Sequence, residues 1–119
     1  TLQSFIDTHG FALLTTMGED EPWVSQLPVL LERAAGPRGT LLTHMARANP
    51  HWRYADGEPA RVVFAGPHAY ITPTWYAADN VVPTWNYVTV HALGVCELVL
   101  DSDEILEIVT RTVRKYEAR

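Results

Sequence analysis

The segment from Thr43 to Pro50 combines residue types that together suit a phosphate group. It follows an apolar run typical of a strand and ends at Asn49-Pro50, a pair typical of a helix N-cap and first turn. A helix N-terminus carries unpaired N–H groups and a partial positive charge, and the Arg47 guanidinium is a fork that matches phosphate oxygens. The segment therefore predicts a phosphomonoester site. The alternative is an ordinary turn in which Arg47 makes a surface ion pair.

A cluster of aromatic and polar side chains occupies residues 82–87 (VPTWNY). Trp85 and Tyr87 offer flat apolar surfaces, while Thr84 and Asn86 offer hydrogen-bonding groups. This combination suits an aromatic heterocycle with a polar edge. The alternative is a barrel rim plugged by aromatic residues, and the segment alone leaves both interpretations open.

The run Ser25-Gln26-Leu27-Pro28 is a third candidate. Its proline forces an irregularity into a predicted strand, and irregular backbone exposes N–H and C=O groups that a ligand ring can use. The five histidines show no metal-ligand spacing, and Cys96 lies on an aliphatic strand face where an inert core thiol is expected. The sequence holds no G-x-S-x-G, P-loop or G-x-G-x-x-G pattern, so no metal site and no catalytic residue are assigned.

Short strands in close succession must position these candidates. Apolar and alternating runs predict strands over residues 11–17, 23–31, 40–45, 60–65, 68–75 and 84–100. Helices are predicted for residues 1–10, for a short stretch after Asn49-Pro50 and from Ser102 onward. Pro28 predicts an edge or a bulge in its strand. In the last strand the even-numbered side chains are small or aliphatic, so they are expected to face a barrel interior.

This succession predicts a mainly β fold, a small antiparallel β-barrel with flanking helices. The 119 residues predict a single domain, and the 47% that are hydrophobic are enough for a core. Four tryptophans are more than such a barrel can easily bury. Since exposed aromatic patches usually mark interfaces, the sequence predicts a dimer.

Composition also limits the partners. The net charge of −5 excludes non-specific nucleic-acid binding by bulk charge. No apolar run approaches the about 18–20 residues of a membrane span, so no membrane partner is predicted. A single cysteine excludes a disulfide framework and fits a reducing, cytoplasmic setting.

Three runs in the chain resemble a known family: residues 44–52 (HMARANPHW), 64–76 (FAGPHAYITPTWY) and 81–94 (VVPTWNYVTVHALG). They are similar to the PaiB family, whose members are described as FMN-binding negative transcriptional regulators. The motifs occur in order and the match covers nearly the whole chain. The resemblance implies an FMN-binding split barrel of antiparallel Greek-key type, the fold shared with pyridoxamine 5′-phosphate oxidase and some haem-degrading proteins. It also implies a homodimer with FMN at the subunit interface.

The resemblance implies site residues on three segments. On the phosphate side they are Thr43, His44 and Arg47. On the ring side they lie in the stretch from Ser25 to Pro28, where many relatives have an Asn-His-Leu-Pro-like pattern and this chain has Ser25, Gln26, Leu27 and Pro28. The long strand adds three more from the partner subunit: Thr84, Trp85 and Asn86.

The chain also departs from the family in length. Relatives begin with a Met-Tyr-x-Pro-like stretch, carry a longer loop where this chain has residues 77–81, and extend past the last helix. We therefore expect the protein to have an N-terminal stretch, further residues of a mobile loop near 77–81 and a C-terminal extension in addition to these 119 residues.

The resemblance favours a flavin-binding regulator, and DNA enters as a partner only through the family description. The basic residues of the last helix are the one cluster that could contact DNA, and the alternative is a solvated helix C-terminus: Arg111, Arg114, Lys115 and Arg119. A second interpretation is an FMN-dependent oxidoreductase, similar to pyridoxamine phosphate oxidase or to flavin reductases. A haem-handling protein and a flavin-free interaction domain are further alternatives.

Overall fold

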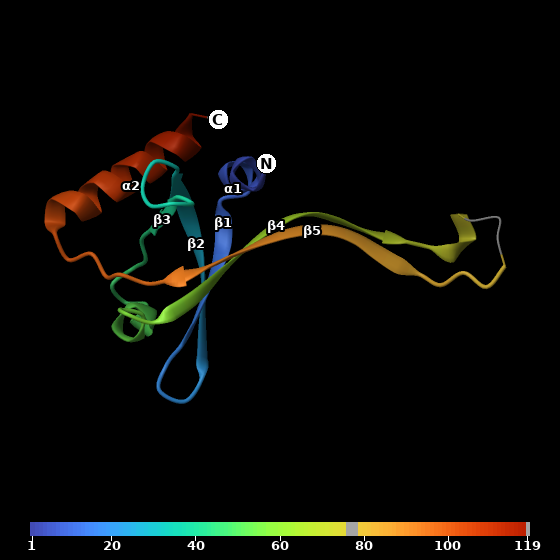
Figure 1. Cartoon of the computed structure of the whole chain (residues 1–119), viewed down its shortest axis with the longest axis horizontal. Helices are drawn as coiled ribbons and strands as arrows, with labels where there is room; N and C mark the ends of the chain where they lie inside the picture. Colours follow the sequence, from blue (N-terminus) through green and yellow to red (C-terminus); the bar gives the residue numbers. More distant parts are fainter. Residues whose placement is uncertain (76–78, 119) are drawn as a thin grey trace.

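Five antiparallel strands form one twisted sheet in the order β3-β2-β1-β4-β5 (Figure 1). The computed structural model describes residues 1–75 and 79–118. The elements, in chain order, are α1 (Leu2–Thr8), β1 (Phe11–Met17), β2 (Pro22–Glu32), β3 (Thr40–Thr43), the 3-10 helix η1 (Pro50–Tyr54), β4 (Pro59–Ile71), the 3-10 helix η2 (Pro73–Trp75), β5 (Thr84–Val95) and α2 (Ser102–Glu117).

The sheet order confirms the predicted mainly β architecture with flanking helices. Strands β1, β2 and β3 follow one another, and the chain then crosses through η1 so that β4 pairs with β1. A fourth strand that returns beside the first is the Greek-key arrangement. The strongly twisted sheet that results is consistent with a split-barrel-like fold.

Several predicted boundaries need correction. The strands expected at 60–65 and 68–75 are one strand, β4, because Gly66 and Pro67 form a bulge between Ala65 and His68 rather than a turn. The strand expected over 84–100 ends at Val95. The loop expected near 77–81 falls partly outside the described residues.

Pro28 shows how a proline fits inside the sheet. The N–H of Val29 bonds to Gly10 on the β1 side, so the nitrogen of Pro28 points to the other side of β2. On that side β3 pairs only with residues Val29 to Glu32, so no ladder bond is lost at Pro28. At Pro28 one side of β2 therefore has no neighbouring strand, as the proline predicted, although β2 itself lies inside the sheet.

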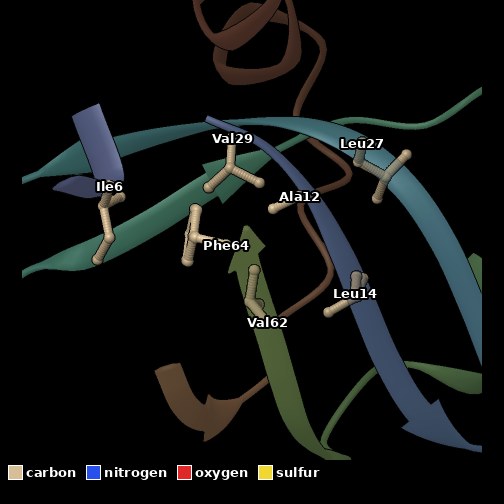
Figure 2. Close-up of a cluster of buried hydrophobic side chains, with 7 residues drawn as sticks. All are labelled: Ile6, Ala12, Leu14, Leu27, Val29, Val62 and Phe64. Carbon is tan, nitrogen blue, oxygen red and sulfur yellow. The ribbon is translucent and has the colours of Figure 1, made fainter. Parts of the chain in front are cut away.

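One face of the sheet carries the core, drawn in Figure 2. Its buried side chains come from α1, β1, β2 and β4: Ile6, Ala12, Leu14, Leu27, Val29, Val62 and Phe64. Val90 and Ala92 of β5, and Cys96 just after it, pack against this cluster. The prediction that even-numbered positions face inward therefore holds at Val90, Ala92 and Cys96, whereas Val88 and Leu100 are 50% and 75% exposed.

The opposite face of the sheet is also largely apolar, yet it is exposed. We call it the outer face, and the strand register places these side chains on it: Phe11, Leu13, Thr15, Met17, Val24, Gln26, Arg61, Val63, His91, Leu93 and Val95. Most of its apolar members are more than one-third exposed. An apolar face of this extent is typical of an interface rather than of a free surface.

Beyond the bulge, β4 and β5 leave the sheet as a two-stranded arm (Figure 1). The chain consequently extends over 61 × 39 × 29 Å, and its radius of gyration is 17.8 Å. A compact domain of 119 residues has a radius of gyration of about 13.5 Å. The arm is rooted in the body, where the ring of Phe5 of α1 packs over Gly66 so closely that a Cβ there would lie 2.9 Å from it.

Among residues 1–75 and 79–118, no helix combines the length and apolar composition that crossing a membrane requires.

Candidate functional site

The end of β3 brings two of the three candidate segments together. Thr43 donates its hydroxyl proton to the carbonyl of Pro28 at 2.6 Å, because β3 pairs with β2 immediately after that proline. The predicted phosphate-side segment therefore starts beside the predicted ring-side segment. The same bond commits the single proton of Thr43, so that hydroxyl is left as an acceptor.

The loop after β3 is held by hydrogen bonds to its own backbone and leaves two polar groups without partners among the described residues. The N–H of Asn49 bonds to Ala46 at 2.9 Å, and the indole of Trp52 bonds to the carbonyl of Arg47 at 2.9 Å. The side chain of Arg47 is exposed, and the two ion pairs found within the described residues do not involve it. Within residues 1–75 and 79–118, Arg47 therefore makes no surface ion pair, which was the alternative that the sequence left open. The Nδ1 atom of His44 is buried without a hydrogen-bond partner there.

A fully buried histidine anchors this loop from behind. The Nε2 atom of His51 lies 2.7 Å from the hydroxyl of Thr16, and its Nδ1 atom lies 2.7 Å from the hydroxyl of Ser25. Asn49 caps η1 by accepting from the N–H of His51, and its amide donates to the same Ser25 hydroxyl at 3.0 Å. Burial lowers the pKa of His51, so the imidazole is neutral at pH 7.

The residues of the ring-side segment point alternately to the two faces of β2. Ser25 and Leu27 are buried on the core side, and the hydroxyl of Ser25 is engaged by His51. Gln26 is exposed on the outer face, where its amide donates to the carbonyl of Phe11 at 3.2 Å. A ligand on the outer face would therefore meet Gln26 and Pro28, with Ser25 behind them.

Thr84, Trp85 and Asn86 lie on the arm and are not brought to the other two segments within one chain. Trp85 makes ring contacts with His68 and Tyr70 at centroid distances of 5.8 and 5.5 Å, and it remains 55% exposed. Gln26 shares its row across the sheet with His91. Six residues of strand separate His91 from Trp85, which corresponds to about 20 Å.

His51 is the structural residue that the sequence interpretation missed. The available signal was local: a histidine directly after the Asn49-Pro50 cap, with hydroxyl residues at inward positions of two predicted strands. Its hydrogen-bond partners lie 35 and 26 positions away in the chain, so their meeting depends on the sheet pairing.

Comparison with known proteins matches residues 1–119 to the family described as "Putative FMN-binding domain". The chain belongs to this family. It is 36% identical over 115 residues to "Protease synthase and sporulation protein PAI 2" of Bacillus subtilis (strain 168), a match that covers 96% of this chain and 54% of that protein. It is also 26% identical over 116 residues to "Uncharacterized protein YKL070W" of Saccharomyces cerevisiae (strain ATCC 204508 / S288c), with 90% of this chain and 69% of that protein covered. The predicted resemblance to PaiB is confirmed, and the chain spans about half the length of the Bacillus relative.

The loop chemistry of this family member fits the charged end of FMN. A phosphate needs hydrogen-bond donors and positive charge, and Arg47 supplies five N–H donors that no described residue uses. The unpartnered Nδ1 atom of His44 lies one residue past β3 and is a second group that a ligand could satisfy. Burying such an atom without a partner costs about 1–3 kcal/mol, which a bound ligand group would relieve.

Proposed function

We propose that this chain binds FMN through its phosphate at the end of β3 and acts as a flavin-binding regulator of the PaiB kind. The observation that supports this most is the loop from Thr43 to Asn49. Its backbone is fixed at both ends, while Arg47 and His44 are left without partners among the described residues. When bound, FMN supplies one- and two-electron redox chemistry that the side chains of this chain lack.

We further propose that the site is completed by a second copy of the chain. In this arrangement the flavin ring lies against the outer face near Gln26 and Pro28 of one copy, with Thr84, Trp85 and Asn86 of the other beside it. Trp85 lies about 20 Å along β5 from His91, the residue that shares a row with Gln26. This supports the arrangement, because a single flavin ring is far shorter than that distance.

The exposed area supports the same dimer. The chain exposes 8633 Å² for a mass of 13.3 kDa. A folded monomer of that mass exposes about 6,450 Å², so this chain carries an excess of about 2,200 Å². Interfaces of obligate homodimers bury areas of this order from each copy. A two-stranded arm with both faces in water is only marginally stable by itself, so a second protein surface packed against it would stabilise it.

The proposal is tested by titrating FMN into the protein and following flavin fluorescence. Arg47→Ala should weaken binding by about 1.5–3 kcal/mol, the range for hydrogen bonds to charged groups, which is about ten- to 150-fold in Kd. Arg38→Ala is the matched control, since Arg38 is an equally exposed arginine on the loop before β3. An unchanged Kd for the Arg47 variant would remove the phosphate assignment.

Direct DNA binding by this chain is not part of the proposal. The net charge is −5, and Arg111 of the basic cluster on α2 donates to Glu32 at 2.8 Å. Regulation would then pass through a further protein segment or a partner. A cytoplasmic location stays a prediction from the cysteine content.

A further inference from the structure

The loop that carries Arg47 is tied to the sheet at two points. At its start, Thr43 bonds to the carbonyl of Pro28. At its end, η1 is tied through Asn49 and His51 to hydroxyls on β2 and β1. The second tie is unusual because all of its partners are side chains, and the central one is a titratable ring without exposure to solvent.

The hydrogen bonds of this tie form one connected network. The amide of Asn49 donates to Ser25, since the amide oxygen is used by the N–H of His51. A neutral His51 ring satisfies both of its contacts in either tautomer. With the proton on Nε2, Ser25 donates to Nδ1 and Nε2–H donates to Thr16; with the proton on Nδ1, Ser25 accepts from the ring as well as from Asn49, and Thr16 donates to Nε2.

The surroundings of the ring keep it neutral. The side chains that face His51 come from β1 (Thr16), from β2 (Trp23 and Ser25) and from the loop before η1 (Asn49), and none of these four carries a charge. The ring of Trp23 lies 6.0 Å from that of His51 and is itself stacked against Tyr54 at 5.2 Å. A charged imidazole here would have no counter-ion among these four side chains.

We propose that His51 is a positioning residue for the anion-binding loop: by bridging Thr16 of β1 and Ser25 of β2, it fixes η1 on the sheet and thereby presents Arg47 and His44 to the phosphate. This inference rests on the proposed function for the identity of the ligand. The inference also requires residues 44–49 to be rigid in the free protein, and this part does not depend on FMN binding. The indole bond from Trp52 to the Arg47 carbonyl transmits the position of η1 to the arginine.

Thr16→Val tests this proposal, because Thr16 lies on β1 and is not a residue of the proposed binding loop. The substitution removes the partner of Nε2 while keeping the side-chain shape. Thr112→Val is the matched control: Thr112 is also buried, but its hydroxyl bonds within α2 to Ile108. Hydrogen exchange of the amides at 44–49 is measured without FMN, and the Kd for FMN is measured separately.

We expect exchange at 44–49 to be about two- to tenfold faster in Thr16→Val, the range for losing one net hydrogen bond, with a similar loss of FMN affinity. Thr112→Val should change neither the exchange at 44–49 nor the Kd for FMN. His51→Phe, which removes both ties, should exceed Thr16→Val in both readouts. Unchanged exchange at 44–49 in Thr16→Val and His51→Phe would overturn the inference, as would equal acceleration over the whole chain. If the wild-type protein fails to bind FMN, the proposed function fails, and the exchange result still decides the role of His51.

Discussion

Replacing Leu93 by lysine should convert the protein from a dimer to a monomer. Leu93 lies on the outer face of the edge strand β5, opposite Arg61, and its side chain is 73% exposed in the single chain. The substitution therefore costs the isolated fold little. At a two-fold interface it buries one unpaired ammonium group from each copy, next to the like charge of Arg61. At about 3 kcal/mol for each buried unpaired charge, dimerisation becomes less favourable by about 6 kcal/mol, which raises the dimer dissociation constant by about four decades.

Sedimentation velocity at micromolar concentration measures this effect. The control is Leu106→Lys on α2, where the leucine is 64% exposed and lies off the outer face. We expect the control to remain dimeric and the Leu93 variant to sediment as a folded monomer with an unchanged circular dichroism spectrum. A Leu93 variant that stays dimeric would show that the outer face is not the interface, and a monomeric wild type would refute the two-copy site itself.

The remaining predictions concern titratable groups. Burial lowers the pKa of His51 below its ordinary value of 6.5, so below that pH the unfolded chain binds more protons there than the folded chain. Unfolding free energy should therefore fall as pH drops through 6.5 towards the folded pKa, by at most about 1.4 kcal/mol per pH unit, and His51→Gln should lack this component in urea titrations. Burial, together with the carboxylates of Asp56 and Glu58, raises the pKa of the Cys96 thiol, so a disulfide reagent at pH 8 should react more slowly with folded than with unfolded protein. Equal rates would contradict that assignment.

The strands could be predicted because their signals are local. Alternation of buried and exposed side chains along Phe11–Met17 is visible in the sequence itself, and so is the cap that starts η1. Gly66 and Pro67 are typical of a turn, yet here β4 continues through them, since pairing with β5 on both sides outweighs the local preference. Turn chemistry alone cannot distinguish a bulge from the end of a strand.

The candidate site was predictable in its parts but not in its assembly. Arg47 and Gln26 could be chosen from residue type and position, whereas the tie between Thr43 and Pro28 follows from the register of β2 and β3. The hydrogen-bond cluster around His51 depends on β1, β2 and the start of η1 coming together, and no spacing in the sequence reveals that contact. The separation of Trp85 from Gln26 likewise follows from strand length and sheet order. The proposal that a second chain completes the site rests on this separation.

The central claim is tested most directly by an absorbance-monitored titration of the purified protein with FMN, combined with the mass of the complex. We expect saturable changes in the flavin bands that end at one FMN per chain, in a particle of two chains. Flavin bands that stay unchanged when FMN is in excess over the protein would contradict it.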